Sequence, residues 1–141
     1  LVDAQHFGWT LGDKSFDWIA LRDHVQQDVT RLEGLYGQTL GNHDVTIFHE
    51  RATITGDHEI TLASGKTATA KYILIATGAR PLVPEFPGSE HVITSNEAFH
   101  LDELPRRILI AGGGYIANEF AGIFNGFGSK VTIANRSDTI L

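Results

Sequence analysis

The sequence predicts an α/β fold in which a long helix and an antiparallel β-meander precede one strand–helix–strand unit. Three observations support this prediction. Apolar residues recur at helical spacing up to about residue 40, and the spacing then changes to two, as in strands. Near the carboxyl end, two short β-branched runs flank a glycine-rich turn and an apolar helical segment. That order is typical of a right-handed βαβ unit.

The first element is a long amphipathic helix within residues 15–40. Its polar residues alternate with apolar ones at a spacing of three to four, so that one face of the helix is apolar. Asp17 is a candidate N-cap and Gly41 a candidate stop signal. The apolar positions are Val25, Val29, Leu32 and Tyr36.

A period of two begins at Asp44 and predicts an antiparallel meander. Turn signals at Gly56-Asp57 and at Ser64-Gly65 break the segment into short strands. The alternating apolar residues are Val45, Ile47, Ile54, Ile60 and Leu62.

Residues 72–76 form a continuous apolar run that ends at Thr77-Gly78. Such a run predicts a strand buried on both faces of a parallel sheet. The following residues, 79–105, contain all four prolines and predict an irregular crossing between two structural units. We expect a first domain over 1–80, a crossing segment over 81–105 and a second domain over 106–141. Within the last, we expect strands at 107–111 and 130–134, with the glycine turn and helix over 112–127.

Composition excludes several classes of function. The formal net charge of −6 argues against a nucleic-acid partner, which usually meets a basic surface. No run of eighteen apolar residues is present, so we expect no membrane partner and a cytoplasmic location. The chain has no cysteine, and its seven histidines show no close pairing, so we expect no metal site. It also lacks methionine and begins with Leu1, which fits an internal segment of a longer protein; a processed or engineered terminus is the alternative.

The glycine turn carries the main functional signal. Gly112, Gly114 and Ala117 follow the G-x-G-x-x-G/A pattern directly after one strand and at the start of a helix. Gly112 permits the tight turn, Gly114 lets the backbone approach a pyrophosphate, and Ala117 allows close packing of helix on strand. The free N–H groups at the helix start favour the same anion. The alternative is a glycine-rich turn that only packs.

The end of the second strand indicates which dinucleotide is bound. An NAD site usually has an acidic residue there, whereas an NADP site has arginine for the 2′-phosphate. Asn135-Arg136 occupies this place, and a guanidinium can bind phosphate in a bidentate way. We therefore predict NADPH. NAD binding is an alternative, because the carboxylate of Asp138 lies close by in the sequence. A second alternative is that Arg136 contacts only water.

Longer motifs resemble a known family. ATGARP, then TSNEAF, LP and GGGYIANEFAG, resemble the disulfide-reductase flavoenzymes, and HFGW, FDW, RLEGLY and NRSDTIL are similar to bacterial and plant-type glutathione reductases. The resemblance spans essentially the whole chain. It implies a Rossmann-like βαβ unit of an NADP domain joined to part of an FAD domain. It also implies FAD and NADPH as cofactors and glutathione disulfide as substrate, with electrons passing through FAD and a cysteine pair.

The resemblance also assigns roles to single residues. Tyr36 matches a tyrosine beside the glutathione-disulfide cleft, although its place on the apolar helical face suits a core tyrosine equally well. Tyr115 matches the tyrosine that covers the flavin. Glu119 matches a position that contacts NADPH, but it could instead only interact favourably with the helix dipole. The residues matching FAD contacts are Ala52, Thr77 and Gly78. Those matching NADPH contacts are Gly112, Gly113, Gly114, Tyr115, Ile116, Ala117, Glu119 and Arg136.

The family pattern places its redox cysteines and first glycine fingerprint before Leu1, and its acid/base histidine and dimer-forming domain after Leu141. We therefore expect no catalytic residue within this sequence, and a homodimer for the whole enzyme. The alternatives are a dihydrolipoamide dehydrogenase, a mercuric reductase or a non-catalytic nucleotide-binding fragment.

Overall fold

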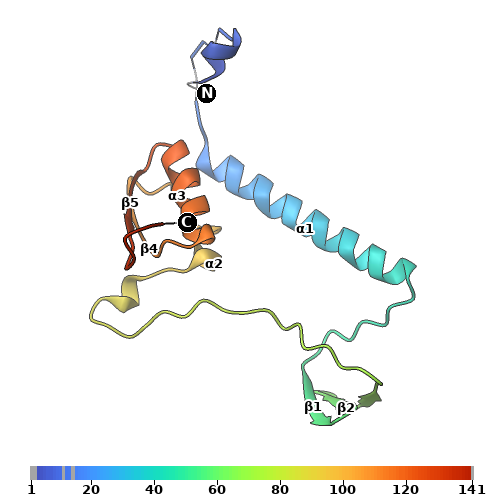
Figure 1. Cartoon of the computed structure of the whole chain (residues 1–141). Helices are drawn as coiled ribbons and strands as arrows, with labels where there is room; N and C mark the ends of the chain where they lie inside the picture. Colours follow the sequence, from blue (N-terminus) through green and yellow to red (C-terminus); the bar gives the residue numbers. More distant parts are fainter. Residues whose placement is uncertain (1–2, 11, 14, 141) are drawn as a thin grey trace. The chain divides into compact units, whose positions relative to one another are not determined.

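A computed structural model describes residues 3–10, 12–13 and 15–140 (Figure 1). The chain divides into two compact units. Unit 1 combines Leu1–Asp28 with Val83–Leu141, and unit 2 is Val29–Leu82. The long helix α1 (Trp18–Asn42) begins in unit 1 and ends in unit 2.

Unit 1 contains the predicted βαβ unit. Strand β4 (Arg107–Ala111) pairs in parallel with β5 (Lys130–Ala134), and helix α3 (Tyr115–Gly126) connects them and lies against both (Figure 1). The pairing runs in register from the first residue of each strand to the last. It extends into the glycine turn, because the Gly112 N–H donates to the Ala134 carbonyl at 2.8 Å. Both predicted strands are confirmed with the expected bounds.

The core of unit 1 is aromatic. Phe124 of α3 is only 1% exposed, and its ring centroid lies 6.0 Å from that of Trp18 and 6.1 Å from that of Phe120. The Trp18 indole donates from Nε1 to the Leu101 carbonyl at 2.8 Å. The start of α1 is therefore fixed both by aromatic packing, which stabilises beyond area burial alone, and by a hydrogen bond.

Helix α1 begins where the sequence predicts and ends later. The Asp17 carboxylate accepts from the Ala20 N–H at 3.0 Å, which confirms the N-cap. Gly41 does not end the helix, which is a correction. Instead Asp44, at φ 55°, donates its N–H to the Gly41 carbonyl, and the Val45 N–H reaches the Leu40 carbonyl, each at 3.1 Å. This is a Schellman ending in which aspartate adopts the left-handed conformation that glycine usually supplies.

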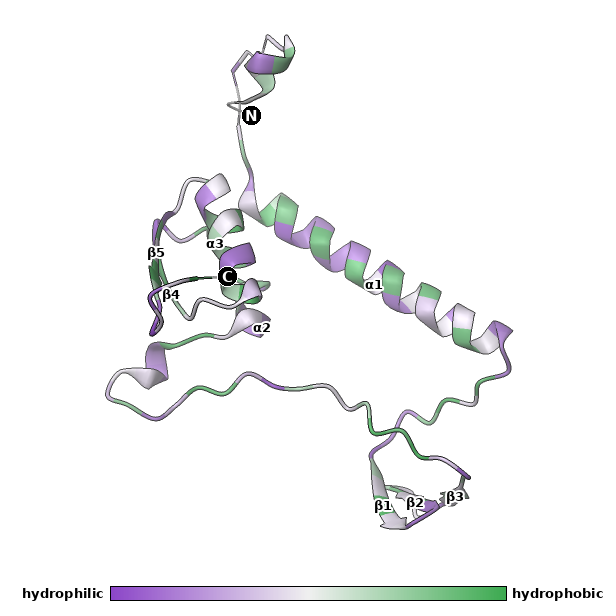
Figure 2. Ribbon diagram, viewed as in Figure 1, coloured by the Kyte–Doolittle hydropathy of each residue, from purple (hydrophilic) through white to green (hydrophobic). Residues whose placement is uncertain are grey.

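Polar and apolar residues alternate around α1, as Figure 2 shows. Among the described residues of this helix none is buried, and Val29, Leu32 and Tyr36 are exposed. The apolar face that the sequence predicts is therefore present, half-buried at Val25 in unit 1, but its part in unit 2 is not covered within that unit.

Unit 2 contains the predicted antiparallel meander. Strands β1 (Ala52–Gly56), β2 (Glu59–Leu62) and β3 (Thr67–Thr69) lie in that order. The turns fall near Asp57 and near Gly65, as predicted. Leu62 is the buried residue of this sheet. Val45 and Ile47, also predicted to lie in strands, do not, because the chain leaving α1 is irregular up to residue 51.

The predicted strand at 72–76 is absent, which is a second correction. The whole segment from 72 to 82 is irregular, and Leu74 is 88% exposed. A strand exists only through the ladder it forms with a neighbour. Within the described residues, no strand lies beside this segment.

The proline-bearing segment is mostly irregular, as predicted, with two short helical turns, η2 (Ser89–His91) and α2 (Ser95–Ala98). Another 3-10 turn, η1 (Asp3–Phe7), lies near the amino end. No helix in the described ranges is long and apolar enough to cross a membrane.

Candidate functional site

The candidate site lies at the carboxyl edge of the β4–β5 pair. Because the two strands are parallel and in register, the residues that follow them emerge at the same edge. The glycine turn follows Ala111 and the Asn135-Arg136 pair follows Ala134. Open α/β sheets bind ligands at this carboxyl edge.

Three consecutive glycines form the turn, and they differ in what the fold requires of each. Gly112 has φ 124°, a conformation that L side chains rarely adopt. Gly113 has ordinary φ, but a Cβ there would lie 2.7 Å from Cγ of Asn135. Gly114 has φ −76°, and a Cβ there would meet nothing within 4 Å. The fold therefore explains the first two glycines and leaves the third open to an approaching ligand.

Helix α3 begins at this turn without a side-chain cap. Gly114 is its N-cap, and no side chain of the described chain accepts from its first N–H groups. By helix geometry these donors have no partner inside the helix. The first turn of α3 also has no acidic residue. An anion would therefore meet free donors and the positive end of the helix dipole.

The side chains predicted to contact NADPH surround this helix start. Tyr115, Ile116 and Glu119 are exposed, and Ala117 is half-buried, as close packing on the strands requires. Arg136 is exposed in the loop after β5, and within the described part of the chain it forms no ion pair. One edge of unit 1 thus carries the whole predicted NADPH set.

Asn135 was not predicted to be a site residue. Its Nδ2 donates to the Ser137 carbonyl at 3.0 Å and to the Thr139 carbonyl at 2.7 Å. The only signal in the sequence is its residue type, since asparagine commonly bonds to nearby backbone in turns. Its contact with Gly113 connects residues 22 positions apart, which local patterns do not reveal.

The predicted FAD and substrate residues all lie in unit 2. Ala52 is exposed at the start of β1 opposite Leu62, and Tyr36 is exposed on α1. Thr77 and Gly78 are exposed in the irregular segment, where Gly78 has φ 70°. No hydrogen bond among the described residues joins these four, so their roles stay predictions.

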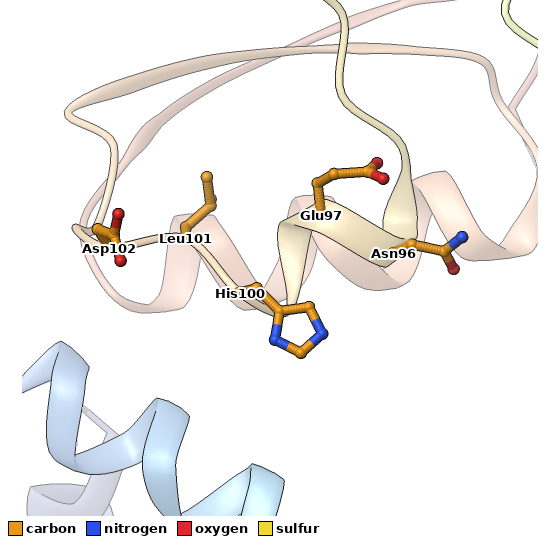
Figure 3. Close-up of a pocket in the computed structure, with 5 residues that line it drawn as sticks. All are labelled: Asn96, Glu97, His100, Leu101 and Asp102. Carbon is orange, nitrogen blue, oxygen red and sulfur yellow. The ribbon is translucent and has the colours of Figure 1, made fainter.

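A surface hollow lies in the crossing segment of unit 1, away from the glycine turn (Figure 3). Thr94 donates its hydroxyl at 2.6 Å and its N–H at 2.7 Å to the Glu97 carboxylate, and these bonds hold the pKa of Glu97 below its ordinary value. Asp102 pairs with Arg22 at 3.2 Å. Figure 3 shows Glu97 pointing to one side of the segment and the His100 ring to the other. These groups cap a helix and anchor α1, and they do not converge on a ligand.

The chain belongs to the pyridine nucleotide-disulphide oxidoreductase family, whose profile matches residues 7–141. It is 45% identical over 139 residues to the glutathione reductase of Burkholderia cepacia and 43% identical over 139 residues to that of a Nostoc species. It is also 39% identical over 140 residues to the chloroplastic/mitochondrial glutathione reductase of Pisum sativum. Each match covers 99% of this chain but only 31%, 30% and 25% of the respective relative.

Solved structures agree on the fold. The HOCl-induced flavoprotein disulfide reductase RclA from Escherichia coli superimposes with a TM-score of 0.77 at 29% identity. Its Cu(II) complex gives 0.78 at the same identity. Each match covers 89% of this chain and 30% of the other. The chain thus spans about a third or less of the relatives and structures it matches.

Proposed function

We propose that this chain supplies the NADPH-binding edge, and part of the FAD site, of a flavoenzyme that reduces glutathione disulfide to glutathione. The observation that carries the proposal is the open space at Gly114, where a ligand can approach the backbone. Beside it, α3 begins without a side-chain cap, and Arg136 rather than a carboxylate follows the end of β5. Family membership and the similarity to three glutathione reductases support it.

Each feature of the edge suits one part of NADPH. The pyrophosphate would lie over Gly114, where no side chain intervenes, and accept from the first N–H groups of α3. The 2′-phosphate would meet the guanidinium of Arg136. Tyr115, exposed at the first position of α3, would cover the flavin until the nicotinamide displaces it.

The remaining roles lie outside this edge. NADPH would supply an electron pair, and bound FAD would pass that pair on toward the disulfide. Ala52, Thr77 and Gly78 would contact FAD, and Tyr36 would border the disulfide cleft. Thiolate exchange needs a cysteine sulfur, and this sequence has none, so the chain by itself does not carry out that step. We further propose functional domains over 1–80 and 106–141 joined by 81–105, and a cytoplasmic homodimer.

The cofactor assignment is tested by Arg136→Glu. The substitution replaces a phosphate-binding cation by a repelling anion, so we expect it to weaken NADPH binding by about 2 to 4 kcal/mol and NADH binding far less. Titration calorimetry with both nucleotides measures the difference. Lys130→Glu is the matched control, because Lys130 is equally cationic but begins β5 at the opposite edge. Equal losses for the two nucleotides in Arg136→Glu would rule out the 2′-phosphate contact.

A second candidate function rests on Asp138. This exposed carboxylate, in the loop that carries Arg136, could bind the ribose hydroxyls of NAD, as in a dihydrolipoamide dehydrogenase. The same titration separates the two. Tighter NADH than NADPH binding, lost in Asp138→Asn, would favour the NAD enzyme.

A further inference from the structure

Asn135 connects the two halves of the candidate site. On one side its side chain fills the space beside Gly113, where a Cβ would lie 2.7 Å from its Cγ and 2.8 Å from both its Nδ2 and Oδ1. On the other side its amide donates to two carbonyls of the loop that follows β5. Its side chain is half-buried, whereas Arg136 and Ser137 are exposed.

These bonds close the loop over residues 135–139. Both accepting carbonyls lie downstream of Arg136, and Asn135 lies immediately upstream. The backbone of Arg136 is therefore held between Asn135 and the two carbonyl groups that its side chain binds. A guanidinium on a closed loop loses less conformational freedom when it binds phosphate than one on an open loop.

We propose that Asn135 is a positioning residue that sets the preference for a 2′-phosphorylated dinucleotide by holding Arg136 at the glycine turn. This inference rests on the proposed function, since it assumes that Arg136 binds the 2′-phosphate. It adds the residue that orients the arginine, and it explains why the middle position of the turn is glycine. Any side chain at 113 would displace the Asn135 amide from the loop.

The residue type supports this role. Only a side-chain amide of this length both donates to the two carbonyls and leaves no charge beside the phosphate. Aspartate would offer acceptors to carbonyl oxygens that are themselves acceptors, and its charge would repel the 2′-phosphate. Leucine has a similar size but no donor, so it removes the bonds while keeping the packing against the turn.

The test is Asn135→Leu in the chain, with NADPH and NADH titrated by calorimetry. We expect NADPH affinity to fall about three- to tenfold, the value of one or two net hydrogen bonds, with NADH affinity unchanged. Asn125→Leu is the control, because Asn125 is an exposed asparagine at the far end of α3. Far-UV circular dichroism and thermal melting confirm that each variant is folded. If Asn135→Leu unfolds the chain, Asn135→Ala, which also has no side-chain donor, takes its place with the same expectation.

A double-mutant cycle with Arg136→Gln separates the possible failures. If Asn135 acts through Arg136, the double variant binds NADPH no more weakly than Arg136→Gln alone. If Arg136→Gln alone leaves the NADPH preference unchanged, the proposed function fails, and the positioning role fails with it. If Arg136→Gln removes the preference but Asn135→Leu does not, or if the two losses add, only the positioning role is overturned.

Discussion

The same four residues, Ile-Leu-Ile-Ala, occur twice in this chain with different outcomes. At 108–111 they lie in β4, and at 73–76 they lie in an irregular segment. Both copies are followed within two residues by a glycine at positive φ, Gly112 in one case and Gly78 in the other. Local sequence therefore cannot explain the difference.

The difference is the neighbouring strand. Each residue of the β4 copy lies opposite a residue of β5, and α3 covers the pair. The other copy has no pairing strand among the described residues, and its Leu74 and Ile75 are 88% and 67% exposed. Leu109 in β4 is also 66% exposed, so pairing, and not burial of every side chain, separates the two copies.

The largest expected difference comes from placing a charge in each copy. Ile110→Asp puts a carboxylate on the half-buried face of β4, and we expect it to lower the free energy of unfolding by about 3 kcal/mol. The equivalent change in the other copy, Ile75→Asp, should stay within about 0.5 kcal/mol because that side chain is in water. Urea denaturation followed by circular dichroism gives both values. Similar losses would show that the two copies are equally structured.

A smaller difference is expected at the turns. Gly112→Ala forces alanine into φ 124° at a residue whose N–H is bonded to Ala134, so we expect a cost of about 1 to 2 kcal/mol. Gly78→Ala should cost less than about 0.5 kcal/mol, because the irregular backbone around it can adjust. Midpoints of thermal unfolding would reveal the contrast. A larger loss at Gly78 would mean that the backbone around Gly78 is held as firmly as the turn after β4.

The smallest effect is expected at Gly113, where the constraint comes from one side chain. Gly113→Ala should cost about 1 kcal/mol, because the new Cβ displaces the Asn135 amide and its loop bonds. In an Asn135→Ala background, Gly113→Ala should cost less than about 0.5 kcal/mol, because the amide that the new Cβ would meet is absent. The quantity to measure is the coupling between Gly113→Ala and Asn135→Ala in the free energy of unfolding. Additive costs would show that Gly113 is required for another reason.

These contrasts also mark how far the sequence determines the structure. The strands and turn of the βαβ unit were predicted to the residue, because periodicity, the glycine pattern and the partner strand lie within 28 residues. The meander was predicted from its period of two and its turns, although Val45 and Ile47 lie outside its strands. The strand predicted at 72–76 was wrong, because a continuous apolar run reflects side-chain preference and says nothing of whether a partner strand is present.

Within the site, the sequence located the glycine turn and Arg136 but not the contact between Gly113 and Asn135. That contact depends on the register of β4 with β5, which brings the ends of both strands to one edge. The ending of α1 at Asp44 was missed for a related reason. Aspartate rarely adopts positive φ, and its use here follows from hydrogen bonds to Leu40 and Gly41 that only the folded turn shows.

The central claim is that Gly114 is glycine because a pyrophosphate approaches it. The direct test is calorimetric titration of NADPH into the chain, into Gly114→Val and into Gly122→Val. The last is the matched control, since Gly122 also lies in α3 and a Cβ there also meets nothing within 4 Å. We predict that Gly114→Val stays folded, with only a small fall in melting temperature from the poorer N-cap, but weakens NADPH binding at least about tenfold. Gly122→Val should bind NADPH as the unchanged chain does. Equal NADPH affinity in all three would contradict the claim.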